Sequence, residues 1–227
     1  ASAGDINGDG YSDVIIGAPD YNNGVATVGK FFIFHGSANN LPSIPSFVKT
    51  GTNSGASIYR IGRCVASAGD VNGDGYSDVA VGITTGVFAV SAFGGVEIYY
   101  GSPSGINSTP SWTKSSTVSE DNFGTSVATA GDVNGDGYSD IIVGAWGLNS
   151  FSGAAYSFYG SENGLSSNAN WSTVGTSASW YGYSVSSAGD VNGDGHADVV
   201  VGAPNDSYFG SPNGSAFVYH GSSSGLS

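Results

Sequence analysis

The sequence predicts an all-β fold assembled from four similar units, and three observations support this. An acidic, glycine-rich phrase recurs four times in the 227 residues, at intervals of about 60 residues. Each copy leads into an apolar run and then into an aromatic segment that ends in Gly-Ser. No segment keeps an apolar period of 3.6 residues without glycine breaks, so helices are not expected. Tandem units of four short strands are typical of β-propeller blades.

The third unit illustrates the expected order of strands, which we name A to D. Strand A covers residues 123–130, strand B 140–145, strand C 154–160 and strand D 170–175. The acidic phrase is the connection between strands A and B. Because strand B is a continuous apolar run, it is expected to be buried on both faces.

The repeat divides the chain into units within a single propeller region, residues 1–227. The units cover approximately residues 1–60, 61–122, 123–180 and 181–227. The first contains only the tail of a strand A, and the last contains no strand D. Because open sheet edges invite pairing, we expect this region to belong to a larger ring of about seven blades, or to be completed by another chain through self-association.

Composition limits the classes of partner. The net charge is −13, and the five cations are too few to form the basic surface that nucleic acid or an anionic membrane requires. No apolar run is long enough to insert into a membrane. Cys64 is the only cysteine, so no internal disulfide can form. A chain rich in Ser, Thr and Asn but poor in Lys favours an extracellular or cell-surface location.

The acidic phrase has the ligand pattern of a calcium loop. Positions 1, 3, 5 and 9 are Asp, Asn, Asp and Asp, position 6 is a turn glycine, and position 7 would offer its main-chain carbonyl. Oxygen ligands at this spacing suit Ca²⁺ better than zinc or copper. About four Ca²⁺ ions, one per unit, are therefore expected. The predicted ligands are Asp5, Asn7, Asp9, Tyr11 and Asp13; Asp70, Asn72, Asp74, Tyr76 and Asp78; Asp132, Asn134, Asp136, Tyr138 and Asp140; and Asp190, Asn192, Asp194, His196 and Asp198.

Two other interpretations of the phrase are weaker. An EF-hand requires Glu at position 12 and flanking helices, whereas here position 12 is Ile or Val and the flanks are strands. A chain of metal-free Asn-Gly and Asp-Gly turns is possible. However, four copies that all retain three acids favour a metal.

The phrase and its neighbours resemble a known family. Phe123-Gly124 before the phrase, the phrase itself, and Gly202-Ala203-Pro204 after it closely resemble the FG-GAP repeat of integrin α-subunit propellers and their bacterial and archaeal relatives. The resemblance covers nearly the whole chain. It implies a propeller of about seven blades, Ca²⁺ in the A–B loops on one face, and adhesion or ligand binding by loops on the opposite face.

The chain departs from the FG-GAP pattern at a few positions. Ile61 and Tyr181 replace the Phe, while Ile83 and Trp146 interrupt the Gly-Ala-Pro. These are apolar exchanges, so packing is expected to tolerate them.

The loops that do not repeat are the expected ligand-binding surface. The B–C and D–A connections vary most and carry aromatic residues, which contact partners when exposed. Covering the blade ends is the alternative role for these rings. The candidates for binding a protein or glycan are Tyr21, Phe88, Trp146, Trp180 and Tyr208.

Catalysis is not expected. His35 and His220 share a strand-end position with tyrosines of the other units, which indicates a structural role. Cys64 corresponds to serines, which suggests a small packed residue. The leading hypothesis is a non-catalytic calcium-binding propeller for extracellular adhesion or recognition. The alternatives are a lectin-like or substrate-targeting module of a secreted enzyme, and a structural subunit of a surface assembly.

Overall fold

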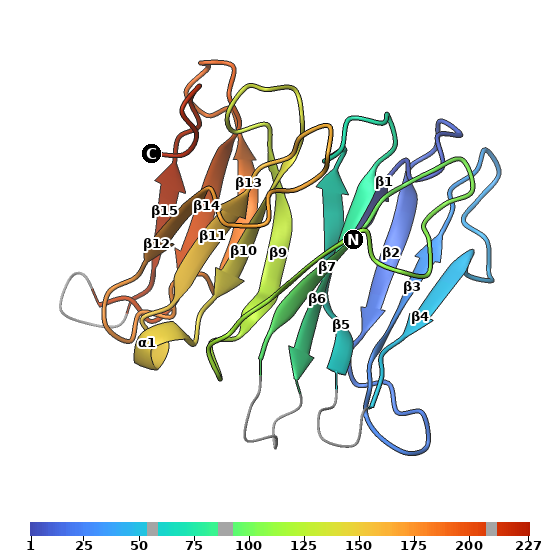
Figure 1. Ribbon diagram of the computed structural model, residues 1–227, viewed down its shortest axis with the longest axis horizontal. Coiled ribbons are helices and arrows are strands. Elements are labelled where there is room, and N and C mark those ends of the chain that lie inside the picture. Colours follow the sequence, from blue (N-terminus) through green and yellow to red (C-terminus); the bar gives the residue numbers. More distant parts are fainter. Residues whose placement is uncertain (54–58, 86–92, 208–212) are drawn as a thin grey trace.

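Four antiparallel sheets stand side by side in chain order (Figure 1). This computed structural model describes residues 1–53, 59–85, 93–207 and 213–227. The first sheet contains β1 (Ser2–Gly4), β2 (Asp13–Ala18), β3 (Lys30–Phe34) and β4 (Phe47–Thr50). The second contains β5 (Tyr59–Gly69), β6 (Asp78–Thr85), β7 (Gly95–Tyr99) and β8 (Trp112–Ser115). The third contains β9 (Phe123–Gly131), β10 (Asp140–Ala145), β11 (Ala154–Phe158) and β12 (Trp171–Val174). The fourth contains β13 (Ser184–Gly189), β14 (Asp198–Ala203) and β15 (Ser215–Tyr219).

The predicted all-β architecture is confirmed. Within each sheet the strands follow chain order as a meander, with strand A at one edge and, where present, strand D at the other. The fourth sheet has three strands and lacks strand D, while β1 is only three residues long. The sheets are therefore blades of a partial propeller, and the size of any complete ring stays a prediction.

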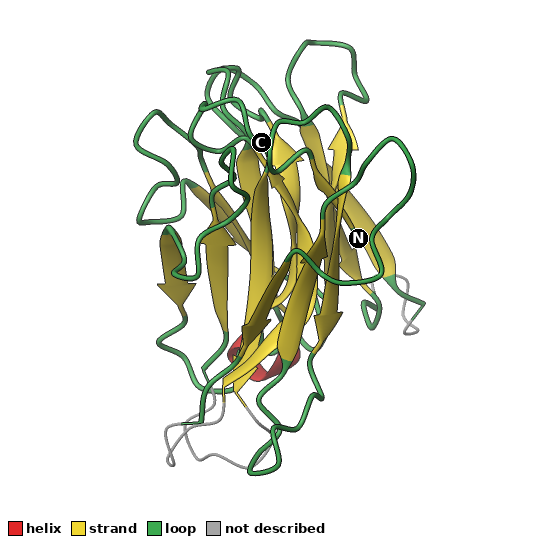
Figure 2. Ribbon diagram, turned by 90° about the vertical axis from the view of Figure 1, so that its right-hand side faces the viewer, coloured by secondary structure: helices red, strands yellow, loops and turns green. Residues whose placement is uncertain are grey.

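The loops gather at the two ends of the strands (Figure 2). The acidic A–B loops lie at one end, which we call the acidic edge. The B–C and D–A connections lie at the opposite end, which we call the recognition edge; in Figure 1 this is the lower edge. Strand alternation dictates this separation, because strand B carries the chain from one edge to the other.

Each blade shares an apolar core with the next. One core joins the first and second sheets, another the second and third, and a third joins the third and fourth. Strand B is buried on both faces only where both neighbours are present. Every residue of β10 is buried, whereas Ile16 of β2 is 45% exposed because no described sheet covers that side. The expectation of two-sided burial therefore fails for β2.

The departures from the FG-GAP pattern leave the packing intact. Ile61, Phe123 and Tyr181 occupy the same position in consecutive blades, and each is at most 5% exposed. The glycine after each adopts a positive φ and brings its backbone against the preceding blade. Gly182, the glycine after Tyr181, lies against Gly144 of β10. A Cβ added to Gly144 would lie 1.9 Å from the Gly182 carbonyl oxygen. These glycines therefore set the spacing between the sheets.

One helical turn, α1 (Leu148–Phe151), interrupts the β architecture, contrary to the expectation of no helix. Its residues Asn149 and Ser150 have positive φ angles of 50° and 57°, so the backbone of both residues has the left-handed conformation. Apolar periodicity cannot reveal a single turn of this kind. Among the described residues, no helix has the length and apolar character needed to cross a membrane.

Replacing Gly144 tests the close approach between the third and fourth blades. In Gly144→Ala the added methyl group would meet backbone atoms that cannot rotate away, so the free energy of unfolding should fall by about 1–3 kcal/mol. The matched control is Gly202→Ala, where the methyl group meets only the Ser184 hydroxyl, a rotatable side-chain group. Urea unfolding of both variants provides the measurement. Equal losses would contradict this account of blade spacing.

Candidate functional site

The first aspartate of each acidic loop organises the loop backbone. In the third copy, Asp132 Oδ1 accepts hydrogen bonds from the N–H groups of Gly135 (2.7 Å) and Asp136 (3.1 Å), and Oδ2 accepts one from Gly137 (2.8 Å). Three successive loop amides thus point at one carboxylate. The same three bonds recur at Asp5, Asp70 and Asp190.

Positions 3 and 5 are paired with one another. Asn134 Nδ2 donates to Asp136 Oδ2 at 2.9 Å, and the Asp136 N–H donates to Asn134 Oδ1 at 3.1 Å. The Tyr138 N–H donates to Asp136 Oδ1 at 3.0 Å. In the fourth copy the His196 N–H donates to Asp194 at 2.9 Å. All four loops therefore have the same conformation, with positions 3 and 5 at the surface end.

The aspartate at position 9 occupies a different environment from the other two. Asp140 is fully buried, and its two oxygens accept from the Val133 N–H and the Gly160 N–H, each at 2.9 Å. It therefore joins its own acidic loop to the end of strand C in the same blade. The equivalents Asp13, Asp78 and Asp198 are also fully buried and make the same two bonds.

Burial changes the acidity of these buried groups. Desolvation raises the pKa of Asp78 and of Asp140 to about 7, although two backbone N–H donors act in the opposite direction. At Asp198 burial also acts to raise the pKa. There, however, the N–H groups of Gly221 and Val191 and the nearby His220 outweigh it, and the pKa is lowered. His220 Nδ1 lies 3.3 Å from the Asp198 carboxylate.

Backbone hydrogen bonds connect each acidic loop to the next blade. The Ser139 N–H donates to the Asp70 carbonyl at 2.9 Å, and the Ser161 N–H donates to the Val71 carbonyl at 3.1 Å. Equivalent pairs join the first loop to the second blade and the third loop to the fourth. We call these pairs the carbonyl latches. They make the loops at the acidic edge a continuous hydrogen-bonded series.

The residue at position 7 also contacts the preceding loop. Gly73 faces the ring of Tyr138, and Gly135 faces the ring of His196, so closely that a Cβ on either glycine would clash. In both cases a flat ring at position 7 packs over a glycine of the preceding loop. This explains why Tyr and His both occur at this position.

The donor chemistry of the loops fits a hard cation. Each offers carboxylate oxygens at positions 1 and 5, a carboxamide oxygen at position 3 and a main-chain carbonyl at position 7. Within the described residues, no three His, Cys, Asp or Glu side chains converge on one point. The third carboxylate, at position 9, is bonded to backbone N–H groups inside the blade. Its predicted role as a metal ligand stays a prediction.

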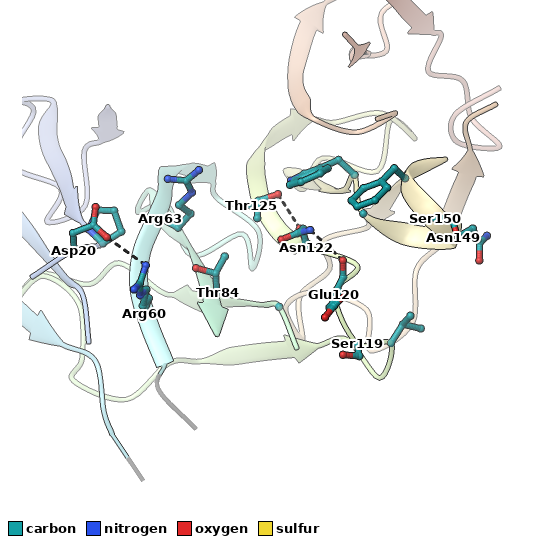
Figure 3. Close-up of a pocket in the computed structure, with 16 residues that line it drawn as sticks. Asp20, Arg60, Arg63, Thr84, Ser119, Glu120, Asn122, Thr125, Asn149 and Ser150 are labelled. Atoms are coloured by element: carbon teal, nitrogen blue, oxygen red, sulfur yellow. Dashed lines mark hydrogen bonds and ion pairs between the residues drawn. The ribbon is translucent and has the colours of Figure 1, made fainter. Parts of the chain in front are cut away.

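The recognition edge contains a cavity of about 820 Å³, which we call the loop cavity. Figure 3 shows Arg60 and Arg63 on one side and Asn149 and Ser150 on the other, with Glu120 between them. The walls come mainly from the second and third blades, and Pro19 and Asp20 of the first blade complete them. The complete lining is Pro19, Asp20, Arg60, Arg63, Thr84, Gly94, Val118, Ser119, Glu120, Asn122, Thr125, Trp146, Gly147, Asn149, Ser150 and Phe151.

Of the predicted binding aromatics, the fold brings two together and places a third on another blade. Trp146 lines the loop cavity, and Trp180 packs against it with ring centroids 5.6 Å apart. Tyr21 lies on the first blade, where the Lys30 ammonium sits 3.5 Å from its ring centre. Phe88 and Tyr208 lie outside the described residues.

The comparisons with known proteins agree with the repeat and its loops. The model of the FG-GAP repeat matches residues 1–34, 65–95, 123–158 and 181–219, which is more than half of the chain. The chain belongs to the FG-GAP repeat family. Each matched segment of this FG-GAP chain contains one acidic loop and reaches strand C of the same blade.

Similar curated proteins include two integrin subunits and an enzyme. Integrin alpha-5 of Xenopus laevis is 35% identical over 158 residues, which are 65% of this chain and 14% of that protein. Integrin alpha-IIb of Homo sapiens is 36% identical over 153 residues, with 64% and 14% covered. Phosphatidylinositol-glycan-specific phospholipase D of Bos taurus is 31% identical over 220 residues, with 89% and 26% covered. The FG-GAP chain thus spans a small part of each relative.

The residues set aside as structural have contacts that suit this role. The Cys64 sulfur accepts from the Val127 N–H of the next blade at 3.4 Å, and Ser126 accepts from the Val185 N–H in the same way. Burial raises the pKa of the Cys64 thiol. His35 packs beside Gly105 of the next blade.

Sequence reasoning missed several residues of the recognition edge. Arg60 and Arg63 were considered only as part of the net charge, and Tyr183 was not singled out among the candidates. The two arginines flank the Ile61-Gly62 motif, so their position in the repeat is the signal that could have placed them at this edge.

The pH dependence of the metal-free protein tests the buried carboxyls. In an unfolded chain Asp78 and Asp140 titrate near pH 4, whereas in the fold they titrate at about 7. Between these values the folded state retains protons that the unfolded state has lost. The free energy of unfolding should therefore fall as the pH rises from about 4 to 7, by up to about 1.4 kcal/mol per pH unit for each group.

Urea unfolding of metal-free protein at pH 5 and pH 7 measures this slope. The control is Asp140→Asn, which cannot titrate at that position and should show a shallower slope, whatever its absolute stability. If the metal-free parent protein instead gains stability from pH 5 to pH 7, the pKa values of the buried carboxyls are not raised.

Proposed function

We propose that this FG-GAP chain is a non-catalytic, calcium-stabilised recognition module of an extracellular or cell-surface protein. The observation that carries the proposal is the contrast between its two edges. The acidic edge repeats the same hydrogen bonds in every blade, as expected of a structural element. The recognition edge differs from blade to blade and contains the loop cavity and exposed aromatic rings.

Calcium has a physical role at the acidic edge. Twelve of the eighteen acidic residues lie in the four loops, so a metal-free edge concentrates negative charge. Calcium bound there would supply positive charge that offsets carboxylate repulsion. In the third loop, Asp132, Asn134, Asp136 and the Tyr138 carbonyl would hold it, with Asp140 as the predicted ninth-position ligand. Because the carbonyl latches begin at positions 1 and 2, fixing one loop also fixes the neighbouring blade.

Recognition at the opposite edge agrees with the relatives. Two of the similar proteins are integrin alpha subunits, which favours adhesion or recognition of a protein or glycan. The proposal also keeps the two sequence-based predictions that this chain does not bind nucleic acid and does not insert into a membrane.

A substrate-targeting module of a secreted enzyme is the second candidate. The match to the phospholipase D spans 89% of this chain but only 26% of that enzyme. This favours a repeat region that accompanies a catalytic part located elsewhere.

Self-association as a surface subunit is the third candidate, favoured by two open faces. Ile16 is 45% exposed on the first blade, and Val191 and Val218 are 56% and 49% exposed on the last. In inner blades the equivalent positions are buried. A mass measurement in solution distinguishes a monomer from an assembly.

Calcium binding should stabilise the fold in a loop-specific way. Free Ca²⁺ at a hundred times its dissociation constant should add about 2.7 kcal/mol per site to the free energy of unfolding. Calorimetric titration should count about four sites, as predicted from one site per loop. Asp136→Ala should remove one of them, because it deletes the position-5 carboxylate of the third loop.

Glu162→Ala is the control, since Glu162 is an exposed acid outside the loops. It should leave both the stoichiometry and the calcium-dependent rise in melting temperature unchanged. A melting temperature that does not differ between excess EDTA and excess calcium would refute the calcium part of the proposal.

A further inference from the structure

We propose that the loop cavity binds a carboxylated saccharide, that is, a sugar chain that carries one carboxylate per ring. This inference rests on the proposed recognition function and specifies its ligand. The cavity volume of about 820 Å³ lies within the range of small-molecule sites, about 300–1,000 Å³. The lining side chains, the backbone conformation of the loops and the hydrogen bonds that hold the loops in place each favour this class of ligand.

An aromatic platform forms one side of the site. The Trp146 and Phe151 rings stack at 5.8 Å with an angle of 19° between their planes. Trp180 and Tyr183 do not line the cavity, but they stack on each other at 6.1 Å and 23° and both contact Trp146. Phe151, which lines the cavity, is 48% exposed. Flat, partly exposed ring faces can pack against the C–H face of a pyranose ring while the sugar hydroxyls stay hydrated.

The cavity brings two cationic side chains together in an acidic protein, beside the carboxylates of Asp20 and Glu120. Arg60 and Arg63 are two of only five lysine and arginine residues in the chain. Arg60 is paired with Asp20 at 3.4 Å, whereas exposed Arg63 makes no ion pair among the described residues. The Arg60 Nε is inaccessible and also has no hydrogen-bond partner there. Arg63 therefore offers a guanidinium group to a carboxylate, which it can bind through two parallel hydrogen bonds.

The remaining polar groups favour a saccharide over an acidic peptide. Glu120 lies in the cavity wall and can accept hydrogen bonds from the hydroxyl groups of a sugar. Amide and hydroxyl side chains complete the lining: Thr84, Ser119, Asn122, Thr125, Asn149 and Ser150. An acidic peptide lacks both the hydroxyl donors and the ring faces that these groups would match.

Backbone strain is concentrated at this cavity. Seven non-glycine residues in the described part of the chain have positive φ, and the five that line the cavity are Glu120, Asn122, Asn149, Ser150 and Phe151. A sixth is Trp180, which packs on Trp146. Each such residue costs about 1–3 kcal/mol, and such residues cluster at functional sites. Glu120 and Asn122 correspond to Ala178 and Trp180 in the next D–A connection, so that part of the pattern repeats. The run Asn149, Ser150 and Phe151 has no left-handed non-glycine equivalent in the other described B–C connections.

Hydrogen bonds hold the strained loops in place without a ligand. The Gly147 N–H donates to the Asp121 carbonyl at 2.9 Å, which ties the two loops of the third blade together. The Asp121 carboxylate is buried and accepts from the Phe123 N–H and the Ser116 hydroxyl. The Trp180 N–H donates to the Phe151 carbonyl at 2.9 Å. The site is therefore largely formed in advance, which reduces the entropy lost on binding.

Three probes separate the possible ligands. The first is a trimer of β-1,4-linked glucuronate, and the second is cellotriose, which has the same rings and linkage without the carboxylates. The third is triglutamate, which has the carboxylates without the rings. Titration in calcium-containing buffer, followed by calorimetry and tryptophan fluorescence, should show binding of the glucuronate trimer. Cellotriose and triglutamate should each bind at least tenfold more weakly.

Two variants test the assigned contacts. Arg63→Gln should weaken binding of the glucuronate trimer at least tenfold and leave any cellotriose binding unchanged. Trp146→Ala should abolish binding of both sugars. Lys114→Gln, the same charge change on a half-buried lysine of β8 that does not line the cavity, should leave binding unchanged. Because Arg63 is exposed, its variant should fold even if Trp146→Ala does not.

Other outcomes would overturn the inference. Equal binding of triglutamate, or binding unaffected by Arg63→Gln, would show that the cavity does not recognise a carboxylated sugar. No binding of any probe by a protein that calcium still stabilises would also overturn it, while the proposed calcium-stabilised module stands. Glucuronate binding by a protein indifferent to calcium would support the saccharide site and refute only the calcium part of the proposed function.

Discussion

The buried aspartate at position 9 of each acidic loop is the constraint on which the blade depends. Asp140 receives one N–H from its own loop and one from the end of strand C, with no exposure to solvent. It therefore fixes the loop relative to the sheet. Once the loop is fixed, the carbonyls at positions 1 and 2 face the next blade, and the carbonyl latches can form. Consecutive blades are thus connected by backbone hydrogen bonds as well as by shared apolar cores.

This view changes the meaning of the acidic phrase. Its ligand spacing predicted a metal loop, and that prediction stays open. Its buried aspartate, its glycine under the next ring and its latched carbonyls have structural roles whether or not a metal binds. Asp78 and Asp140 lie between two neighbouring blades, and burial raises their pKa values to about 7. Protonation is therefore one way of reducing this buried negative charge, and under the proposed function a bound cation would be another.

The fold could be predicted from the sequence because every blade repeats its local signals. Strand order, the acidic connection and the missing strand of the fourth blade all follow from comparing copies. Two-sided burial of strand B failed at Ile16, since burial depends on which neighbours are present rather than on composition. The left-handed turn at Asn149 and Ser150 was missed because it occurs once, and repeat comparison carries no information about single occurrences.

The same reasoning explains why the recognition edge was only partly foreseen. Exposed aromatics in variable loops indicated Trp146 and Trp180 but could not show that their rings meet, since they lie in different connections. Arg63 is exposed at the cavity, although its neighbour Ile61 is buried in the core shared by the first and second blades. A repeated scaffold thus positions residues that do not repeat. The constant spacing of the blades lets parts of the first, second and third blades form one cavity.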